Sequence, residues 1–345
     1  TSYGIITHIN RINPSGEKET TRKTIHAYVQ VNTLTDYFEI CTKTLTISRG
    51  LDLSNASVYG NNLVFLPDGS GTTKVQKASY HNSVQNDTAD WVEIDGLTNQ
   101  PAQKLSHRLD LPIISEIIND YLDLASLDNG YGNSILGHTD CTNGYTSDLS
   151  SENNIYPPKN GTGVYYSSDP IIIGNPSSPT YIHGQMIFVT TNSITIKGDI
   201  LKCYEGRHKI DNDDDGKIDC FKFWDADYNE NPIFYDMKIE VSLVGLLSGA
   251  DILVSKTNSS NQAIDCTVES LILASKGYFR AEQTINASNT AQFQFLGAIM
   301  ICEGILFSDK YTLASNRIYL YDDQLRTHGL PNMPFVANVL YWNER

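Results

Sequence analysis

Apolar and polar residues alternate through the first fifty residues, and one turn interrupts the alternation. Ile5 and Ile9 lie before the turn residues Pro14-Ser15-Gly16, and Ile25 and Val31 lie after them, each separated by polar neighbours. Alternation with a period of two is typical of strands that have one buried face. This part of the chain therefore predicts an antiparallel hairpin or meander with one face in water.

From residue 45 the chain consists of short apolar runs separated by Gly, Asn or Ser. Such runs fill residues 45–66, resume at residues 164–200 and continue through residues 239–323. They predict a β-solenoid, in which each rung buries its inward side chains only against the rungs above and below. Short strands are also typical of β-sandwiches, so a sandwich remains the alternative.

Two segments depart from this pattern. Residues 67–104 are polar and rich in Gly, Ser and Asn, and we expect them to form an excursion outside the core. Apolar side chains at helical spacing then predict one helix at about residues 112–126, with Pro112 in its first turn. We expect this helix to cover an open core.

Charge narrows the range of partners. The 345 residues include 40 Asp and Glu against 25 Lys and Arg, a formal net charge of −15. With no basic block to offset this charge, the sequence disfavours a nucleic-acid partner and docking on anionic lipid. The sequence also contains no continuous apolar run of the roughly 18 residues that a membrane-spanning helix needs.

An acidic stretch, D-N-D-D-D-G-K-I-D, gives the sharpest chemical signal. Asp211, Asp213 and Asp215 occupy positions 1, 3 and 5 of an EF-hand-type loop, Gly216 position 6 and Asp219 position 9. Alternate carboxylates on a tight turn converge on one point, as a hard cation with oxygen ligands requires. We predict a bound Ca²⁺ that orders this insertion, and a solvated acidic turn is the alternative.

The loop departs from the EF-hand pattern at its end. Lys217 at position 7 would contribute its backbone carbonyl, but Lys222 stands at position 12, where EF-hand loops carry a bidentate Glu. A further ligand must then come from elsewhere, and the candidates are Asp225, Asp227 and Glu205.

The cysteines favour export. Six cysteines form an even set without a C-x-x-C pair. Cys203 and Cys220 flank the acidic loop 17 residues apart, and we expect a disulfide between them that contributes about 3 kcal/mol. The pairing of the other four is open. For Cys266 and Cys302, which lie in apolar runs, buried thiols are the alternative.

Aromatic residues accompany the acidic insertion and suggest a recognition surface, formed by Trp224, Tyr228 and Tyr235. The alternative is that they pack the insertion onto the rest of the protein. The sequence contains no nucleophile elbow, phosphate-binding loop or dinucleotide fingerprint, and its histidines are scattered. We therefore expect no enzyme. A β-helix that binds or degrades polysaccharide is the rival, although the clustered carboxylates suit a metal better than catalysis.

Several phrases in order resemble one family. They include the N-terminal S-G-E-K-E-T-T-R-K-T-I-H-A-Y-V, the central G-V-Y-Y-S-S-D-P-I-I-I-G and the late R-I-Y-L-Y-D-D-Q-L. Together with the terminal Y-W-N-E-R they resemble the large minor pilins of bacterial type IV pili that carry a β-solenoid. Tyr321, Asp322 and Leu325 match the phrase that closes the last rung in that family, and Trp342 and Glu344 match its terminal motif.

The resemblance implies a mainly β protein in three parts. Residues 1–44 would form a pilin-like sheet, residues 45–330 the β-solenoid with the helix and a metal-loop insertion at about 203–236, and residues 331–345 a strand returning to the first sheet. It implies an extracellular pilus component, placed at the tip, with other pilin subunits and a surface or glycan ligand as partners. DNA capture is disfavoured by the charge. The sequence opens at Thr1 without Met, so we expect a processed or trimmed chain, with membrane contact only through a missing N-terminal helix.

Overall fold

The computed structural model describes residues 2–12, 18–119, 147–155, 164–203, 222–223, 233–234, 243–282, 284–302, 304–306, 314–328 and 335–344. The chain divides into two compact units. The smaller is Thr1–Leu34 with Pro334–Arg345, and the larger is Thr35–Met333. The division thus falls after residue 34 and not after residue 44 as expected, because β3 (Glu39–Ser48) pairs in parallel with β4 (Asp52–Leu66) of the larger unit.

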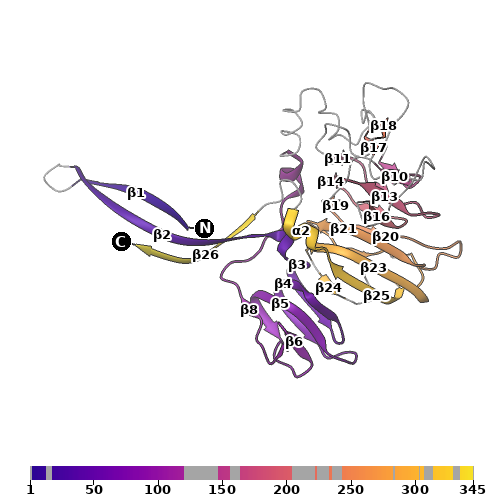
Figure 1. Cartoon of the computed structure of the whole chain (residues 1–345), viewed down its shortest axis with the longest axis horizontal. Helices are drawn as coiled ribbons and strands as arrows, with labels where there is room; N and C mark the ends of the chain where they lie inside the picture. Colours follow the sequence, from indigo (N-terminus) through magenta and orange to yellow (C-terminus); the bar gives the residue numbers. More distant parts are fainter. Residues whose placement is uncertain are drawn as a thin grey trace. The chain divides into compact units, whose positions relative to one another are not determined.

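The smaller unit is a three-stranded antiparallel sheet, with β2 (Lys18–Thr33) between β1 (Ser2–Ile12) and β26 (Phe335–Glu344) (Figure 1). β1 and β2 pair along their length, with Ile5 opposite Ile25. The pairing of β2 with β26 contains an irregularity between Tyr28 and Val29. Strands from both ends of the sequence therefore share one sheet.

The larger unit is mainly β, and its two large sheets, of 16 and five strands, consist largely of parallel pairs. Its early elements are a 3₁₀ turn (Leu34–Asp36), β3, β4, β5 (Thr73–Gln85), β6 (Val92–Ile94), β7 (Leu97–Thr98) and β8 (Gln103–Lys104). Its middle strands are β9 (Asp148–Leu149), β10 (Asn154–Ile155), β11 (Val164–Ser167), β12 (Ile171–Ile173), β13 (Thr180–His183), β14 (Gln185–Thr190), β15 (Ile194–Ile196) and β16 (Ile200–Cys203).

The late elements of this unit are β19 (Leu243–Ser248), β20 (Ile252–Val254), β21 (Cys266–Ala274), β22 (Phe279–Ala281), β23 (Ser288–Ile301), β24 (Gly304–Leu306), β25 (Ala314–Tyr321) and the helix α2 (Asp323–His328). A short antiparallel pair, β17 (Lys222–Phe223) with β18 (Ile233–Phe234), lies between the middle and late strands in the sequence.

Three strand triplets follow one another along the chain. β11, β12 and β13 pair in parallel with β14, β15 and β16, which pair in turn with β19, β20 and β21. Residues in register stack in columns. One column contains Ile171, Ile194, Ile252 and Phe279, all of them fully buried. Alternation within each strand thus places the apolar side chains of successive triplets against one another.

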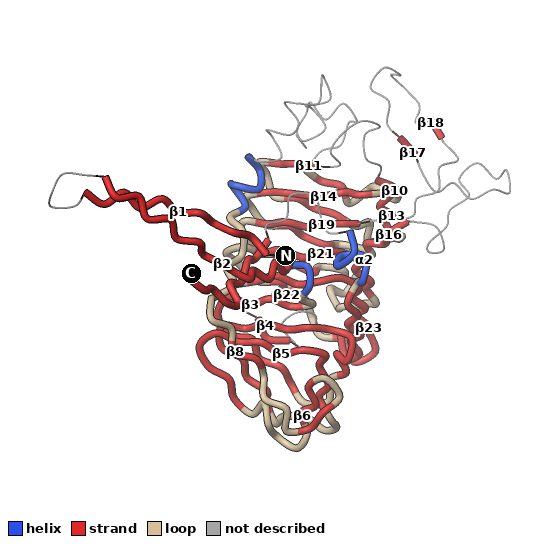
Figure 2. Tube along the Cα trace, turned by 60° about the vertical axis from the view of Figure 1, so that its left-hand side comes forward, coloured by secondary structure: helices blue, strands red, loops and turns tan. Residues whose placement is uncertain are grey.

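The order of the strands in space differs from their order in the sequence. β23, late in the chain, pairs in parallel with β3, which is early, from Ile299 opposite Glu39 to Ile301 opposite Cys41. We call this contact the joint (Figure 2). On one side of it lie β3, β4 and β5, and on the other lie β23, β21 and β16. The larger sheet is therefore continuous only because two stretches far apart in the sequence meet.

An aromatic cluster lies beside the joint. The ring of Phe295 on β23 lies 6.2 Å from that of Phe38, 5.9 Å from that of Phe279 and 6.2 Å from that of Tyr319, measured between centroids. All four side chains are buried. Their edge-on and tilted contacts are those that aromatic rings favour.

The described residues bear on two predictions of local structure. The expected excursion at residues 67–104 was wrong, because β5 pairs with β4 and buries Val75 and Ala78, and β6 buries Val92. Of the predicted helix at residues 112–126, residues 114–119 are helical and bury Ile114 and Ile117, and residues 120–126 lie outside the described part.

Replacing Phe295 with Ala tests the contribution of the aromatic cluster. The variant leaves a large cavity among the rings of Phe38, Phe279 and Tyr319, so we expect the free energy of unfolding to fall by about 3–5 kcal/mol. Urea titration followed by circular dichroism measures this loss. Leu320→Ala on β25 is the control, because Leu320 is 47% exposed and its replacement should change stability by no more than about 0.5 kcal/mol. Equal losses in the two variants would contradict the assignment of the core.

Candidate functional site

Most site residues predicted from the sequence lie outside the described residues. They are the acidic loop with Asp211, Asp213, Asp215, Lys217 and Asp219, the neighbouring Asp225, the aromatic residues Trp224, Tyr228 and Tyr235, and Cys220. Cys203 ends β16, where its backbone is in register with His183. The calcium site, the Cys203–Cys220 disulfide and the recognition surface therefore stay predictions.

Hydroxyl groups occupy one corner of the strand triplets. Ser167, Thr190 and Ser248 are in register on β11, β14 and β19, and all three are buried. Each hydroxyl oxygen accepts a hydrogen bond, 3.0 Å long, from the backbone N–H two residues later. Thr190 also donates to the carbonyl of Asp169, and Ser248 to that of Asn192, in the preceding triplet. This hydroxyl ladder satisfies backbone groups where the strands turn.

Carboxylates have a similar role at other turns. The side chain of Asp199 accepts from the backbone N–H of Thr267 at 2.8 Å and from Lys256 Nζ at 2.7 Å. Asp251 accepts from the N–H of Tyr278 and from Arg280, at 2.8 and 2.7 Å. Asp199 precedes β16, and Thr267 lies on its paired strand β21. Asp251 precedes β20, and Arg280 lies on its paired strand β22. These carboxylates therefore fasten consecutive strands together.

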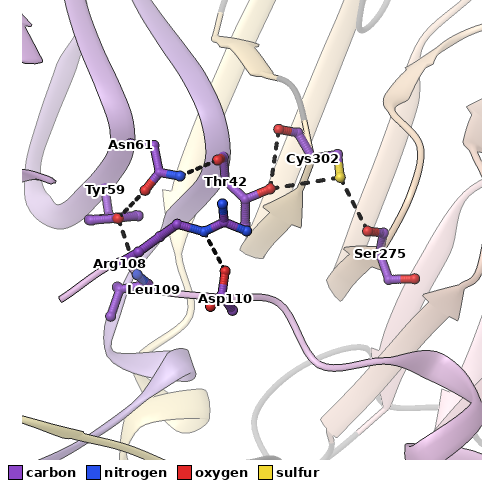
Figure 3. Close-up of polar contacts among 8 residues, drawn as sticks. All are labelled: Thr42, Tyr59, Asn61, Arg108, Leu109, Asp110, Ser275 and Cys302. Atoms are coloured by element: carbon purple, nitrogen blue, oxygen red, sulfur yellow. Dashed lines mark hydrogen bonds and ion pairs between the residues drawn. The ribbon is translucent and has the colours of Figure 1, made fainter. Parts of the chain in front are cut away.

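Figure 3 shows a chain of polar contacts that crosses the joint, from the loop at residues 108–110 to Ser275. The Leu109 N–H donates to Tyr59 Oη at 3.1 Å, and Tyr59 donates to the side-chain oxygen of Asn61. Asn61 Nδ2 donates to the carbonyl of Thr42, at the irregularity between Cys41 and Thr44 of β3. The buried side-chain amide of Asn61 thus donates to a backbone carbonyl at a point where the pairing of β3 with β4 is interrupted.

The chain of contacts continues to the far side of the joint. Thr42 Oγ1 lies 3.4 Å from the carbonyl oxygen of Cys302 and 3.7 Å from its Sγ, which donates to the Ser275 carbonyl at 3.2 Å. Burial raises the pKa of the Tyr59 phenol, so it remains a protonated donor. The network therefore ties β4, β3 and β23 to the loop that follows β8.

A buried ion pair joins two segments of the larger unit that are far apart in the sequence. Lys202, at the end of β16, forms an ion pair with Asp322, which precedes α2. Glu269 on β21 is fully buried and accepts from the backbone N–H of Lys202 at 2.8 Å. Lys202 lies in the apolar run I-L-K-C, and Glu269 lies in the apolar run V-E-S-L. A charged residue within an apolar run is the sequence signal that could have identified both of them.

Among the described residues, no group of three or more His, Cys, Asp or Glu is arranged to hold a metal ion. The helices in the described ranges are all too short or too polar to cross a bilayer. Comparison of the chain with protein-family models, curated proteins and solved structures finds no match.

The thiol of Cys266, at the start of β21, gives a test of the burial of that strand. Burial, reinforced by the negative charge of Asp199, raises the pKa of Cys266 from an ordinary 9.0 to about 12. Below pH 9 this thiol stays neutral in the folded and the unfolded state. The free energy of unfolding falls as the pH rises from 9 towards 12, because the thiol of the unfolded chain ionises first.

At pH 8 we expect iodoacetamide to label the partly exposed Cys302 and not Cys266.

Peptide mapping by mass spectrometry measures the labelling. The same reaction in 8 M urea (roughly the concentration that unfolds most domains) should label both cysteines and serves as the control. Equal rates for Cys266 and Cys302 in the folded protein would contradict the burial of Cys266.

Proposed function

We propose that this chain is a structural and adhesive component of a bacterial type IV pilus, a large minor pilin near the tip, with other pilin subunits as its partners. The observation that carries the proposal is the division into two units. A small antiparallel sheet combines β1, β2 and β26, and a much larger parallel unit is inserted between them in the sequence. This division agrees with a pilin-like sheet that carries a β-solenoid, which the sequence resemblance implies.

The finer architecture of the larger unit is part of the proposal. Parallel partners recur at spacings of 18 to 27 residues where no long insertion intervenes: Ile172 and Thr195 are 23 residues apart, Leu253 and Arg280 are 27 apart, and Leu45 and Leu63 are 18 apart. Across the acidic insertion the spacing is longer, and Thr195 and Leu253 are 58 residues apart. Strands that return at such intervals and pair in parallel favour a β-solenoid over a sandwich, since sandwiches are built from antiparallel sheets. The acidic insertion between β16 and β19 would then be a loop projecting from one rung.

The contacts of the acids favour a structural role over catalysis. A glycan-cleaving site needs a pair of carboxyl groups facing a substrate across a groove. Asp199, Asp251 and Asp265 instead accept backbone N–H groups from the next strand. Pilus-borne DNA capture is opposed by the net charge of −15. Adhesion to a surface or glycan through the insertion, with Trp224, Tyr228 and Tyr235, is the function that remains.

Localisation in cells tests the proposal. Antibodies raised against the larger unit should label surface filaments in immunogold electron microscopy, and the chain should be found by mass spectrometry in filaments sheared from the cells. Deletion of its gene should reduce attachment without removing the major filament subunit. A chain found only free in the medium, with unchanged attachment in the deletion strain, would overturn the proposal in favour of a secreted polysaccharide-binding protein.

Calcium binding tests the insertion separately. We expect isothermal titration to detect one Ca²⁺ site, and EDTA to lower the melting temperature, because binding at about 100 times Kd contributes about 2.7 kcal/mol. Asp213→Ala with Asp215→Ala should abolish both effects. Asp68→Ala is the matched control, since Asp68 is an exposed acid of another loop. No heat of binding and no shift in melting for the unaltered chain would contradict the calcium prediction.

A further inference from the structure

The ion pair of Lys202 and Asp322 is almost completely withdrawn from water. The side chain of Lys202 is 1% exposed and that of Asp322 is 9% exposed. The two residues are 120 positions apart in the sequence. Burial of a charged pair costs several kcal/mol per ion, which the attraction between the ions offsets only in part. A lysine in this setting is therefore unusual and calls for a chemical reason.

The fold brings the two residues together through a series of registers. Ile200 is opposite Val268, Val268 is opposite Phe295, and Phe295 is opposite Tyr319. Lys202 and Asp322 follow the first and last of these residues by two and three positions. Figure 2 shows α2, which begins after Asp322, beside β16 and β21. These registers, together with the ion pair, place the end of β16 close to the segment before α2.

The carboxyl group of Asp322 is held in one orientation. Its Oδ1 accepts from the backbone N–H of Gln324 at 3.1 Å, and its Oδ2 faces Lys202 Nζ. The backbone N–H of Asp322 donates to the Gly297 carbonyl at 3.3 Å, and the side-chain oxygen of Gln324 lies 3.4 Å from Lys202 Nζ. A donor on one carboxyl oxygen polarises the C–O bond and can stabilise negative charge on that oxygen if the carbon is attacked.

A second acid lies beside the lysine. Glu269 is 0% exposed, and its Oε2 accepts from the Lys202 backbone N–H. Lys202 therefore has one buried carboxyl group at its backbone N–H and another, that of Asp322, at its amine, and all three groups have little access to water. In a medium of low dielectric constant, proton transfer from the ammonium to a carboxylate is favoured relative to water, since it removes two charges. The products of that transfer are a neutral amine and a neutral acid.

We propose that Lys202 and Asp322 condense to form an intramolecular amide bond. The lone pair of Lys202 Nζ attacks Cγ of Asp322, a C–N bond forms, and the bond from Cγ to its hydroxyl oxygen breaks. The hydroxyl group leaves with one proton from Nζ, so one water molecule is released and no oxidant or reductant is needed. Glu269 accepts the proton from Nζ and returns it to the leaving oxygen.

Two physical arguments favour the reaction at this site. The fixed contact of amine and acid replaces an encounter in solution, and such positioning can supply effective concentrations of about 10⁵ M or more. The product is also neutral, so it removes the cost of burying two charges. Scarce water in the site opposes hydrolysis of the bond once it has formed. The bond would link β16 covalently to the segment before α2.

Another Lys–Asp contact in the same unit provides a matched comparison. Lys256 Nζ lies 2.7 Å from Asp199 Oδ1, but their side chains are 12% and 20% exposed. Water reaches this pair, and Asp199 also caps the N–H of Thr267. We expect it to remain an ion pair.

The mass of the intact, denatured full chain tests the proposal. We expect the folded protein to give a mass lower by one water molecule, and proteolysis to yield one branched peptide that joins the segments containing Lys202 and Asp322. Lys202→Arg and Asp322→Ala should each restore the full mass. The mass of Lys256→Arg should still be lower by one water molecule than the mass of its own sequence. A full mass for the unaltered, folded chain would overturn the proposal.

Glu269→Gln tests the proton transfer, because it keeps the size of the side chain and the acceptor for the Lys202 N–H. We expect this variant to fold, as judged by circular dichroism, and to show the full mass. If all of the Glu269→Gln protein has a mass lower by one water molecule, the amide forms without Glu269 and the role given to Glu269 is overturned. Lys202→Arg preserves a positive charge, so its melting temperature isolates the covalent link. We expect a decrease of about 5–15 °C.

Discussion

Parallel contact between β23 and β3 is the interaction on which the larger unit depends. The 16-stranded sheet is continuous only through this contact, so its loss would expose a strand edge and the apolar side chains beside it on both sides. At the joint the neighbours come from opposite ends of the sequence: Cys41 and Cys302, 261 positions apart, are in hydrogen-bond contact. The aromatic cluster around Phe295 and the polar contacts through Thr42 and Asn61 both reinforce this one boundary.

The polar side chains of the described core serve mainly the backbone. In a stack of short strands the chain must turn often, and each turn leaves N–H and carbonyl groups that the ladders do not pair. Ser167, Thr190 and Ser248 supply hydroxyl groups at one corner, and acids such as Asp251 supply carboxylates at another. Selection for stacking therefore accounts for many of the polar residues that would otherwise suggest a binding site.

Sequence patterns predicted the local structure better than its assembly. The run Ile171–Ile173 and the alternation at residues 194–196 were expected as strands, and both bury alternate side chains. β5 was missed because its buried positions include Thr73 and Ser79, which read as loop composition. The joint could not be predicted, because pairing between β23 and β3 leaves no periodic trace in the sequence. Lys202 and Glu269 were missed for a related reason: their burial depends on partners far along the chain. The calcium loop, predicted from spacing alone, lies outside the described residues.

The joint also imposes an order on biosynthesis. β3, β4 and β5 leave the ribosome early, and they can pair with one another as soon as they appear. The edge of β3 that will contact β23 stays open until residue 301 has been made, after most of the chain has been synthesised. An open strand edge with apolar neighbours is a site for wrong pairing. We therefore expect nascent chains to need protection of this edge, by a chaperone or by delayed folding, until the second half of the stack arrives.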